Sequence, residues 1–589
     1  MHLRSFFPPA TRRTQTLRIL AILIIFFFVA SISRYQGSFE FSIDEDGQVQ
    51  SIPLNKHDIY YTHHIATYDP KDIHPWTHGD TQTLKTPAGQ NVLKLLTETP
   101  FQNPSDANGH HEKVLKEDHF LTLTKQMRVY RGLWKYLKEY YDELEADGRP
   151  TEFYQAPPTA LAPAIDLFQR IEQHTFPWIL SRYKNSFDLY RQTKNGGMGI
   201  VMCVGNYHVK FARTAIRSLR EVVRSPLPIE IYYLGDNDLS KENRDWFEKI
   251  ENVKTIDLFS TIDNSFLKIE IWAAKPYAIL MSRFSEVILM DSDVFFMDDP
   301  GLLFNDGGYK EVGTMYFYDR TLFPGAGGDK KDWMHTFLPT MSNHPGKTQW
   351  FNSKGDHEME SGVVVFDKRR NFLGLLAICK LNDYYERTQV TYKRTWGDKE
   401  TFWIAMEMIQ ERYSFVRYRG GVIGNVGDAI PFKQVLPKDE IDRYNRGEAL
   451  TVTHPKDPNS GVTTRREKPN MDRVCGNQLH FDDRGKPLWW NSGIVRNKFV
   501  SNSPYLKYTA YMKDEDGSWD FETTCLIQKS PGAIMEVEWD QRKTAFEVLK
   551  VDREIALAAN QPDVFNILDI PELIKSEGAK GGKGNNEAV

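Results

Sequence analysis

Short apolar runs alternate with helix-like segments along the middle of the chain. The apolar runs at 199–205, 229–235, 253–258 and 287–290 have the length of buried strands. Between them, apolar residues recur at helical spacing, most clearly at 209–223 and 273–285. Strands that alternate with helices predict an α/β domain with a parallel sheet, in which ligands bind beyond the carboxyl ends of the strands.

The chain before this domain has a different texture. Residues 35–110 are polar and broken by Pro, His, Asn and Gly, as in a spacer. Apolar spacing then predicts a helix over 118–146 and a second helical stretch over 160–190, interrupted at Pro177. We interpret these parts as three regions: a stem at 34–195, extended and then helical, the α/β domain at 196–545, and a C-terminal extension at 546–589 with a low-complexity tail.

An uncharged apolar segment at 19–33 follows a basic N-terminus. The basic excess predicts that residues 1–18 form a cytoplasmic tail and that the long C-terminal part faces a lumen. Fifteen residues span roughly 22 Å as a helix, which is short for a bilayer core of about 30 Å. A cleaved signal peptide therefore stays open as an alternative, but we favour a transmembrane signal-anchor at 19–33.

Composition narrows the class of protein. The chain has 589 residues, 40% of them apolar, and a net charge of −5. It is long enough for a large core and lacks the basic excess of a nucleic-acid-binding protein. Its four cysteines show no CxxC spacing, which argues against a zinc site, and the sequence leaves their pairing open.

The strand predicted at 287–290 runs into Asp291-Ser292-Asp293 and a second apolar run. Carboxylates at i and i+2 point to the same side of an extended backbone. A hard divalent cation prefers carboxylate oxygens and leaves room for substrate phosphates. The alternative is a solvated turn, but the apolar flanks favour a buried site, where two carboxylates without a cation would repel each other. The pattern therefore predicts a metal–diphosphate site.

Several ordered stretches of the chain resemble the fungal α-mannosyltransferases of glycosyltransferase family 71, with features of the α-1,3 branch. The resemblance covers roughly 195–500. It is carried by AAKPYAILMSRFSEVILMDSDVFFMDDP (273–300), YFYDRTLF (316–323), ESGVVVFDKRR (360–370), WGDKETFW (396–403) and LHFDDRGKPLWWN (479–491), together with YLGDNDL (233–239).

This resemblance implies a GT-A fold, a Rossmann-like mixed sheet flanked by helices. It implies Mn²⁺ as cofactor, GDP-mannose as donor, and a mannose-terminated glycan as acceptor. The expected reaction retains the anomeric configuration and adds an α-1,3-linked mannose in protein glycosylation. The expected location is the Golgi membrane, as a single-pass type II protein with a lumenal catalytic domain.

The resemblance also suggests roles for individual residues. Asp291 and Asp293 would bind Mn²⁺, and Asp291 would also contact the nucleotide-sugar. The 479–491 stretch is similar to a His-containing segment of the family 8 transferases, which makes His480 a candidate third metal ligand and Lys486 a candidate diphosphate contact. A half-buried structural histidine is the alternative for His480.

Two further motifs supply candidate catalytic acids. Asp398 and Glu400 precede a predicted helix, where acids also favour the helix dipole, and we favour Asp398 as the carboxylate beside the transferred sugar. Glu360 leads into an apolar strand and would bind a sugar hydroxyl or flank the anomeric carbon. Ser361 and Gly362 would approach the donor closely, since glycine lacks a side chain. The sequence names no nucleophile.

The remaining candidates surround these motifs. Asn206 and Asp236 end two early strands and would border the nucleotide pocket, and Lys275 would meet phosphate. On the acceptor side we expect Asp319, Arg320 and Trp489.

Two other functions stay open. A UDP-sugar-dependent α-glycosyltransferase of the family 8 type would carry the same Asp-x-Asp, because that motif contacts metal and diphosphate and not the base. A non-catalytic glycan-binding protein on the same fold predicts the loss of key acids, yet Asp291, Asp293 and Asp398 are all present.

Overall fold

The computed structural model describes residues 41–43, 49–51, 64–73, 85–98, 114–323, 325, 328–427, 471–495, 498, 505–520 and 525–559. The chain divides into two compact units, 1–62 and 63–589. Within the first, β1 (Phe41–Ile43) and β2 (Val49–Ser51) form an antiparallel pair. The predicted signal-anchor at 19–33 lies outside the described residues, as does the tail from 578. Among the helices that are described, none has the length and apolarity needed to cross a bilayer.

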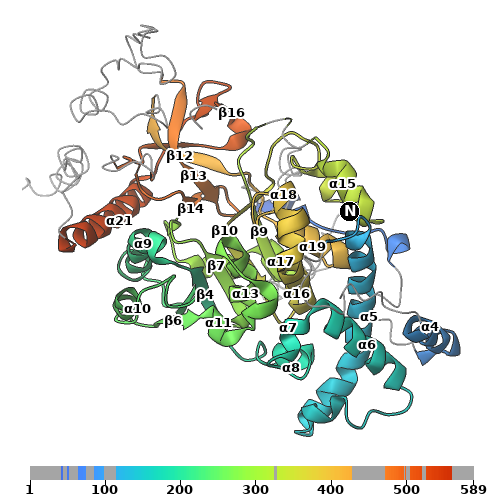
Figure 1. Cartoon of the computed structure of the whole chain (residues 1–589). Helices are drawn as coiled ribbons and strands as arrows, with labels where there is room; N and C mark the ends of the chain where they lie inside the picture. The colour runs from blue at the N-terminus through green and yellow to red at the C-terminus, as the bar shows by residue number, and fades with distance from the viewer. Residues whose placement is uncertain are drawn as a thin grey trace, which may run out of the picture. The chain divides into compact units, whose positions relative to one another are not determined.

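The second unit is built on a mixed eight-stranded sheet (Figure 1). The four strands predicted from apolar runs form its parallel part, in the order β6-β5-β4-β7. Strand β10 then pairs antiparallel with β7 and β9, and two short strands extend the far edge. In sheet order the strands are β6 (Val253–Asp257), β5 (Ile229–Tyr233), β4 (Met198–Cys203), β7 (Glu286–Met290), β10 (Met359–Asp367), β9 (Thr314–Tyr318), β11 (Ser414–Phe415) and β3 (His64–Ile65).

Helices flank this sheet and connect its strands. Helix α13 packs on β4 and β7, and α16 packs on both α13 and α19 (Figure 1). The predicted helices at 209–223 and 273–285 are therefore confirmed with slightly shorter limits. The helices after β4 are α9 (Val209–Glu221), α10 (Lys241–Phe247), α11 (Leu258–Thr261), α12 (Asn264–Leu267), α13 (Ala274–Met281), α14 (Gly307–Val312), α15 (Lys330–Phe337), α16 (Phe372–Leu381), α17 (Tyr384–Glu386), α18 (Tyr392–Arg394) and α19 (Thr401–Ile409).

The register of β10 breaks at the site-bearing motif. Glu360 pairs with Phe317, but the next aligned pair is Val365 with Met315. The residues between them on β10 outnumber those on β9, so the strand bulges over Ser361 and Gly362. Bulges commonly redirect side chains next to functional sites.

The later residues of the domain form a second sheet, with its strands in the order β16-β17-β13-β12-β15-β18. Strand β14 pairs with β13 and also with β8, the short strand after Asp293, so the Asp-x-Asp loop joins the two sheets. The strands are β8 (Phe295–Phe296), β12 (Gly421–Val426), β13 (Arg473–Phe481), β14 (Pro487–Asn491), β15 (Ala510–Met512), β16 (Gly517–Trp519), β17 (Leu526–Gln528) and β18 (Met535–Glu536).

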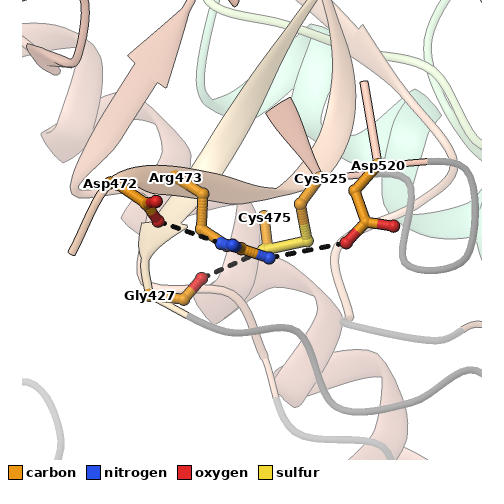
Figure 2. The surroundings of a disulfide bond; sticks show 6 residues. All are labelled: Gly427, Asp472, Arg473, Cys475, Asp520 and Cys525. Atoms are coloured by element: carbon orange, nitrogen blue, oxygen red, sulfur yellow. Dashed lines mark hydrogen bonds and ion pairs between the residues drawn. A yellow bond between two sulfur atoms is a disulfide. The ribbon is translucent and has the colours of Figure 1, made fainter. Parts of the chain in front are cut away.

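One disulfide, Cys475–Cys525, joins β13 to the residue before β17 (Figure 2). Beside it, Arg473 bridges Asp472 and Asp520, with N–O distances of 3.1 and 3.4 Å. Cys203 and Cys379 are free. The sequence left the cysteine pairing open. In the structure one disulfide forms, and it links β13 to the chain just before β17 in the second sheet.

The helices predicted as a stem pack directly on the α/β domain. The predicted helix at 118–146 is confirmed as α5 (His119–Ala146), and it packs against α6, α15 and α19 (Figure 1). Trp134 stacks among core aromatics and lies 5.2 Å from the Phe372 ring of α16. The boundary predicted at 195 therefore does not separate two cores. The other helices here are α4 (Pro87–Glu98), α6 (Ala162–Thr175), α7 (Pro177–Leu180) and α8 (Ser186–Arg191).

The C-terminal helix crosses the other predicted boundary. Helix α21 (Trp539–Ala558) begins before residue 546 and packs on α9 (Figure 1). Thr214 of α9 donates a hydrogen bond of 2.7 Å to Asp552, and Arg217 pairs with Glu554 at 2.8 Å. The described part of the extension thus belongs to the domain.

Candidate functional site

Asp291 and Asp293 follow the buried end of β7, where the two sheets meet. The backbone N–H of Asp291 donates to the Gly362 carbonyl at 2.8 Å, which fixes the loop against β10. The Asp291 side chain keeps 29% of its surface exposed, whereas that of Asp293 keeps 12% and pairs with Lys498. One carboxylate of the predicted pair is thus half-buried and the other is shielded by a lysine.

Lys275 contacts three other predicted residues and holds them together. Its ammonium nitrogen lies 2.8 Å from Asp291 and 3.7 Å from Asp398, and it donates to the Ser361 hydroxyl at 3.2 Å. These residues come from α13, the end of β7, the bulge of β10 and the turn before α19. We call this set, Lys275, Asp291, Ser361 and Asp398, the lysine cluster.

Burial controls the charges in the lysine cluster. It raises the pKa of Asp291 to about 7, although Lys275 opposes the shift. It also raises the pKa of Asp398, again against the effect of Lys275. Burial would lower the pKa of Lys275, but Asp291 and Asp398 raise it, so the lysine stays charged. The Oδ2 atom of Asp398 is buried and faces Lys275 at 3.7 Å, and it has no hydrogen-bond partner among the described residues.

A second group of charges surrounds Lys399. Its ammonium lies 2.5 Å from Asp319 and 3.1 Å from Glu360. Burial would raise the pKa of both acids, but Lys399 lowers them, which keeps both ionised. Asn491 donates to Glu360 at 3.0 Å. Glu360, expected near the donor, and Asp319, expected near the acceptor, therefore share one cation.

Gly362 is required by the packing of this second group. A Cβ atom there would lie 2.7 Å from the Asn491 amide nitrogen and 2.8 Å from a Glu360 oxygen. Its N–H donates to Glu360 at 2.7 Å. The absent side chain thus lets the bulge of β10 turn back onto the carboxylate that precedes it.

Glu400 serves the fold, not the cluster. Its carboxylate accepts hydrogen bonds from the backbone N–H of Glu358 at 2.9 Å and from Trp403 Nε1 at 2.5 Å. These contacts hold the start of β10 against α19. Of the two acids predicted before this helix, the structure places only Asp398 with the other site residues.

His480 lies apart from the two aspartates. Its ring stacks on Trp489 at 3.9 Å and meets Phe317 edge-on at 5.3 Å. Burial lowers the pKa of His480 to about 3, although the charge of Glu360 opposes the shift. In the described part of the chain, no three His, Cys, Asp or Glu side chains are grouped closely enough to hold a metal ion. The predicted three-ligand set is therefore not assembled in this structure.

The aspartate pair nevertheless fits a divalent cation. Such ions are commonly held by one or two carboxylates, with substrate phosphates and water completing the shell. Asp291 and Asp293 offer carboxylate oxygens at a partly exposed loop, and lysines now balance both charges. We expect these two residues to hold a cation together with phosphate oxygens, without His480.

Of two other predicted contacts, one is corrected by the structure and one stays a prediction. Lys486 is half-exposed on the β13–β14 hairpin and pairs with Glu538 at 3.2 Å, and its contact with a diphosphate stays a prediction. Trp489 is fully buried, so its ring offers no face to an acceptor. An aromatic residue in an apolar run more often packs in the core than lines a binding surface, and Trp489 packs in the core.

Asn206 and Asp236 follow β4 and β5 as predicted. Asn206 accepts hydrogen bonds from Ser240 and Asn243 at 3.0 and 2.8 Å, whereas the exposed Asp236 pairs with Arg244. These contacts are local to the two loops and do not link either residue to the lysine cluster. Arg320 lies 3.7 Å from Asp319 and joins the second group.

Sequence reasoning missed three polar residues of this region. Lys399 was passed over although it stands between Asp398 and Glu400. Asn491 closes the 479–491 motif and reaches Glu360. Asp238, two residues past Asp236, accepts from the Leu234 N–H at 2.8 Å, and a Cβ on Gly205 would lie 2.2 Å from it.

Part of the chain is similar to known mannosyltransferases. Residues 197–445 match the family model described as "Mannosyltransferase putative". The Candida albicans protein named "Putative alpha-1,3-mannosyltransferase MNN15" is 27% identical over 57% of this chain and 45% of its own length. The Saccharomyces cerevisiae alpha-1,3-mannosyltransferase MNT3 is 24% identical over 52% of this chain and 48% of its own length. The chain thus spans about half the length of these relatives.

Among solved structures, the Mn/GDP form of core-mannan synthase A from Aspergillus fumigatus is 10% identical, over 36% of this chain and 70% of that one. Its TM-score of 0.24 supports no conclusion about fold or function. The family-model match and the fungal relatives carry the comparison instead. The part of the chain at 197–445 is similar to a mannosyltransferase family and to fungal proteins named alpha-1,3-mannosyltransferases.

Proposed function

We propose that this protein is a metal-dependent, retaining α-mannosyltransferase of the GT-A type. It would transfer mannose from GDP-mannose to a mannose-terminated glycan, in an α-1,3 linkage. The observation that carries the proposal is the lysine cluster, where Lys275 links Asp291 at the strand end to Asp398 before α19. The match of residues 197–445 to a mannosyltransferase family model and the mixed sheet support the same function.

In this proposal each charged residue has a distinct task. Asp291 and Asp293 would hold Mn²⁺, which offsets the charge that develops on the leaving diphosphate. Lys275 would add a positive charge beside the phosphates and keep Asp398 oriented. Asp398, whose Oδ2 faces Lys275 but has no hydrogen-bond partner in the described residues, would accept a hydrogen bond from a sugar hydroxyl. Lys399 would keep Glu360 ionised on the other side of the β10 bulge.

We also propose a Golgi location, with the catalytic domain in the lumen and a type II anchor at 19–33. The Cys475–Cys525 disulfide supports an oxidising compartment. The apolar segment after a basic N-terminus supports the orientation.

A donor screen tests the function. The purified full chain in detergent would be incubated with Mn²⁺, an α-linked mannobiose acceptor, and GDP-mannose, UDP-glucose or UDP-galactose. We expect transfer from GDP-mannose alone, with an α-1,3 product by linkage analysis and NMR of the anomeric proton. Transfer from a UDP-sugar would replace the donor assignment, and a β-linked product would overturn retention. No transfer with retained mannobiose binding would favour a glycan-binding protein.

A further inference from the structure

Two tryptophans, Trp396 and Trp272, are the exposed ones in the part of the chain that the structure describes. Their exposed fractions are 63% and 43%, whereas Trp350, Trp403 and Trp489 are fully buried. A large apolar ring left in water is unfavourable, and exposed aromatic groups often mark binding surfaces. The two rings can form such a surface only if they lie close to each other and to the lysine cluster.

Both tryptophans stand beside the lysine cluster in the chain. Trp272 comes three residues before Lys275, and Trp396 comes two residues before Asp398. Because Lys275 and Asp398 approach to 3.7 Å, the segments that carry the two tryptophans converge. The approach of Lys275 to Asp398 thus brings the two exposed rings to the same part of the surface.

Contacts at Gly397 confirm that the two segments touch. A Cβ atom on Gly397 would lie 2.8 Å from Cε3 of the Trp272 ring. The Trp272 ring therefore covers the backbone of Gly397, and Trp396 is the residue before it. Gly397 has a φ of +65°, which glycine adopts at low cost. Both tryptophans therefore lie at Gly397, the residue before Asp398: Trp272 contacts it in space, and Trp396 precedes it in the chain.

The local backbone is held in a defined conformation. Ile271, before Trp272, has a φ of +44°, which is costly for a β-branched residue. On the other segment, the Thr395 hydroxyl lies within hydrogen-bond distance of the Gly397 and Thr391 carbonyls, at 2.9 and 3.0 Å. Strained backbone of this kind is concentrated at ligand-binding segments.

A hydrogen-bonding group lies next to the outer ring. The His357 ring is 6.2 Å from that of Trp396 and meets it edge-on. Nδ1 of His357 is buried and has no hydrogen-bond partner among the described residues, whereas Nε2 lies 3.6 Å from Asp356. A pyranose ring has a flat apolar face and a rim of hydroxyl groups. An aromatic ring beside a hydrogen-bonding group is the complementary surface.

We propose that Trp396 and Trp272 form an acceptor subsite, in which a mannopyranose ring of the glycan stacks on Trp396 while Trp272 fixes the turn at Gly397. The inference rests on the proposed function for the identity of the sugar. It replaces Trp489, whose ring is buried, as the aromatic contact on the acceptor side. An acceptor held there lies next to Asp398, as transfer from a bound donor requires.

The test uses the full chain in detergent and separates sugar binding from catalysis. Binding of α-linked mannobiose is followed by tryptophan fluorescence, and the acceptor KM and the acceptor-independent hydrolysis of GDP-mannose are measured in parallel. The variants are Trp396→Ala, Trp396→Phe, Trp272→Phe and the control Leu302→Ala, which alters another exposed apolar residue, at 48%.

We expect Trp396→Ala to raise the acceptor Kd and KM by about tenfold or more. Hydrolysis of GDP-mannose should stay within about twofold of wild type, since that step does not use the acceptor. Trp396→Phe should keep most of the binding, and Leu302→Ala all of it. Unchanged mannobiose binding in Trp396→Ala, or an equal loss in Leu302→Ala, would overturn the subsite.

The two proposals fail in different ways. If wild type binds mannobiose through Trp396 but transfers no mannose, the subsite stands and the proposed activity falls. If wild type transfers mannose and Trp396→Ala keeps its acceptor KM, the activity stands and the subsite falls. If wild type transfers mannose without a measurable fluorescence change, the KM of Trp396→Ala decides.

Discussion

The ammonium nitrogen of Lys275 lies 3.7 Å from a carboxylate oxygen of Asp398 and 2.8 Å from one of Asp291. One buried cation thus joins the end of β7 to the turn before α19. All three groups would otherwise be charges buried without compensation, which is costly. Their joint position next to the Asp-x-Asp loop favours a functional role over a purely structural ion pair.

Replacing Lys275 with Met should remove activity without unfolding the protein. The positive charge beside the diphosphate would be lost, and we expect mannose transfer to fall by about 10²–10³-fold. Asp291 and Asp398 would then protonate more readily, which limits the loss of stability. Transfer rates and thermal unfolding measure the two effects.

Lys310→Met, which alters an exposed lysine on α14, is the control and should change neither property. A Lys275→Met variant with wild-type turnover would show that the lysine cluster is structural.

Asp398 and Glu400 should respond in opposite ways to amidation. Asp398→Asn is expected to lower turnover by at least about 10²-fold and to leave folding intact, because its role is toward the ligand. Glu400→Gln places an amide NH₂ against N–H donors from Glu358 or Trp403 and should cost about 1–3 kcal/mol of folding free energy.

Denaturant unfolding and turnover per folded molecule distinguish the two residues. Lost turnover in a stable Glu400→Gln, or normal turnover in Asp398→Asn, would reverse the assignment.

The Cys475–Cys525 disulfide should stabilise the second sheet. It closes a separation of 50 residues, so the Cys475→Ser/Cys525→Ser double variant should lose about 2–4 kcal/mol of folding free energy. Wild type in reductant should unfold at the same lowered temperature as the double variant. If reductant leaves the wild-type melting temperature unchanged, the two cysteines are not bonded in the protein.

The lowered pKa of Glu386 makes the folding stability depend on pH in a specific way. It lies 2.9 Å from His119 at the start of α5 and 3.1 Å from Lys380. Burial would raise its pKa, but Lys380 and His119 lower it from 4.5 to about 2. Because the folded pKa is below the unfolded one, the stabilisation is present above about pH 4.5 and is lost as the pH falls toward 2.

Glu386→Gln should therefore lose up to about 3 kcal/mol at pH 7 and show a flatter stability profile on the acid side. Denaturant unfolding between pH 7 and about pH 2 measures this, with the exposed Glu139→Gln on α5 as control. Equal acid sensitivity in wild type and Glu386→Gln would contradict the ion-pair account of this contact.

The local elements of the fold were predictable because their signals are local. The apolar runs at 229–235 and 287–290 became β5 and β7, and the helical spacing at 118–146 became α5. The Asp-x-Asp loop was predictable for the same reason, since an acidic pair directly after a buried strand needs no knowledge of distant residues.

Burial and long-range pairing were not predictable from such signals. Trp489 and Trp396 both lie in motifs with apolar neighbours, yet one is fully buried and the other is 63% exposed. The Trp489 ring is covered by residues of β13, β8 and β9, and the sequence alone does not show that these strands lie together. Lys399 was missed because its partners, Asp319 and Glu360, come from two strands that pair only in the folded sheet.

Mn²⁺-dependent release of GDP from GDP-mannose is the measurement that tests the central claim most directly. The full chain in detergent would be compared with Asp291→Asn and Asp293→Asn, with and without a chelator, after circular dichroism confirms that all three are folded. We predict release by wild type that requires Mn²⁺ and falls by at least about 10²-fold in both variants. Release that persists in the chelator, or at the wild-type rate in Asp293→Asn, would contradict a metal–diphosphate site at the end of β7.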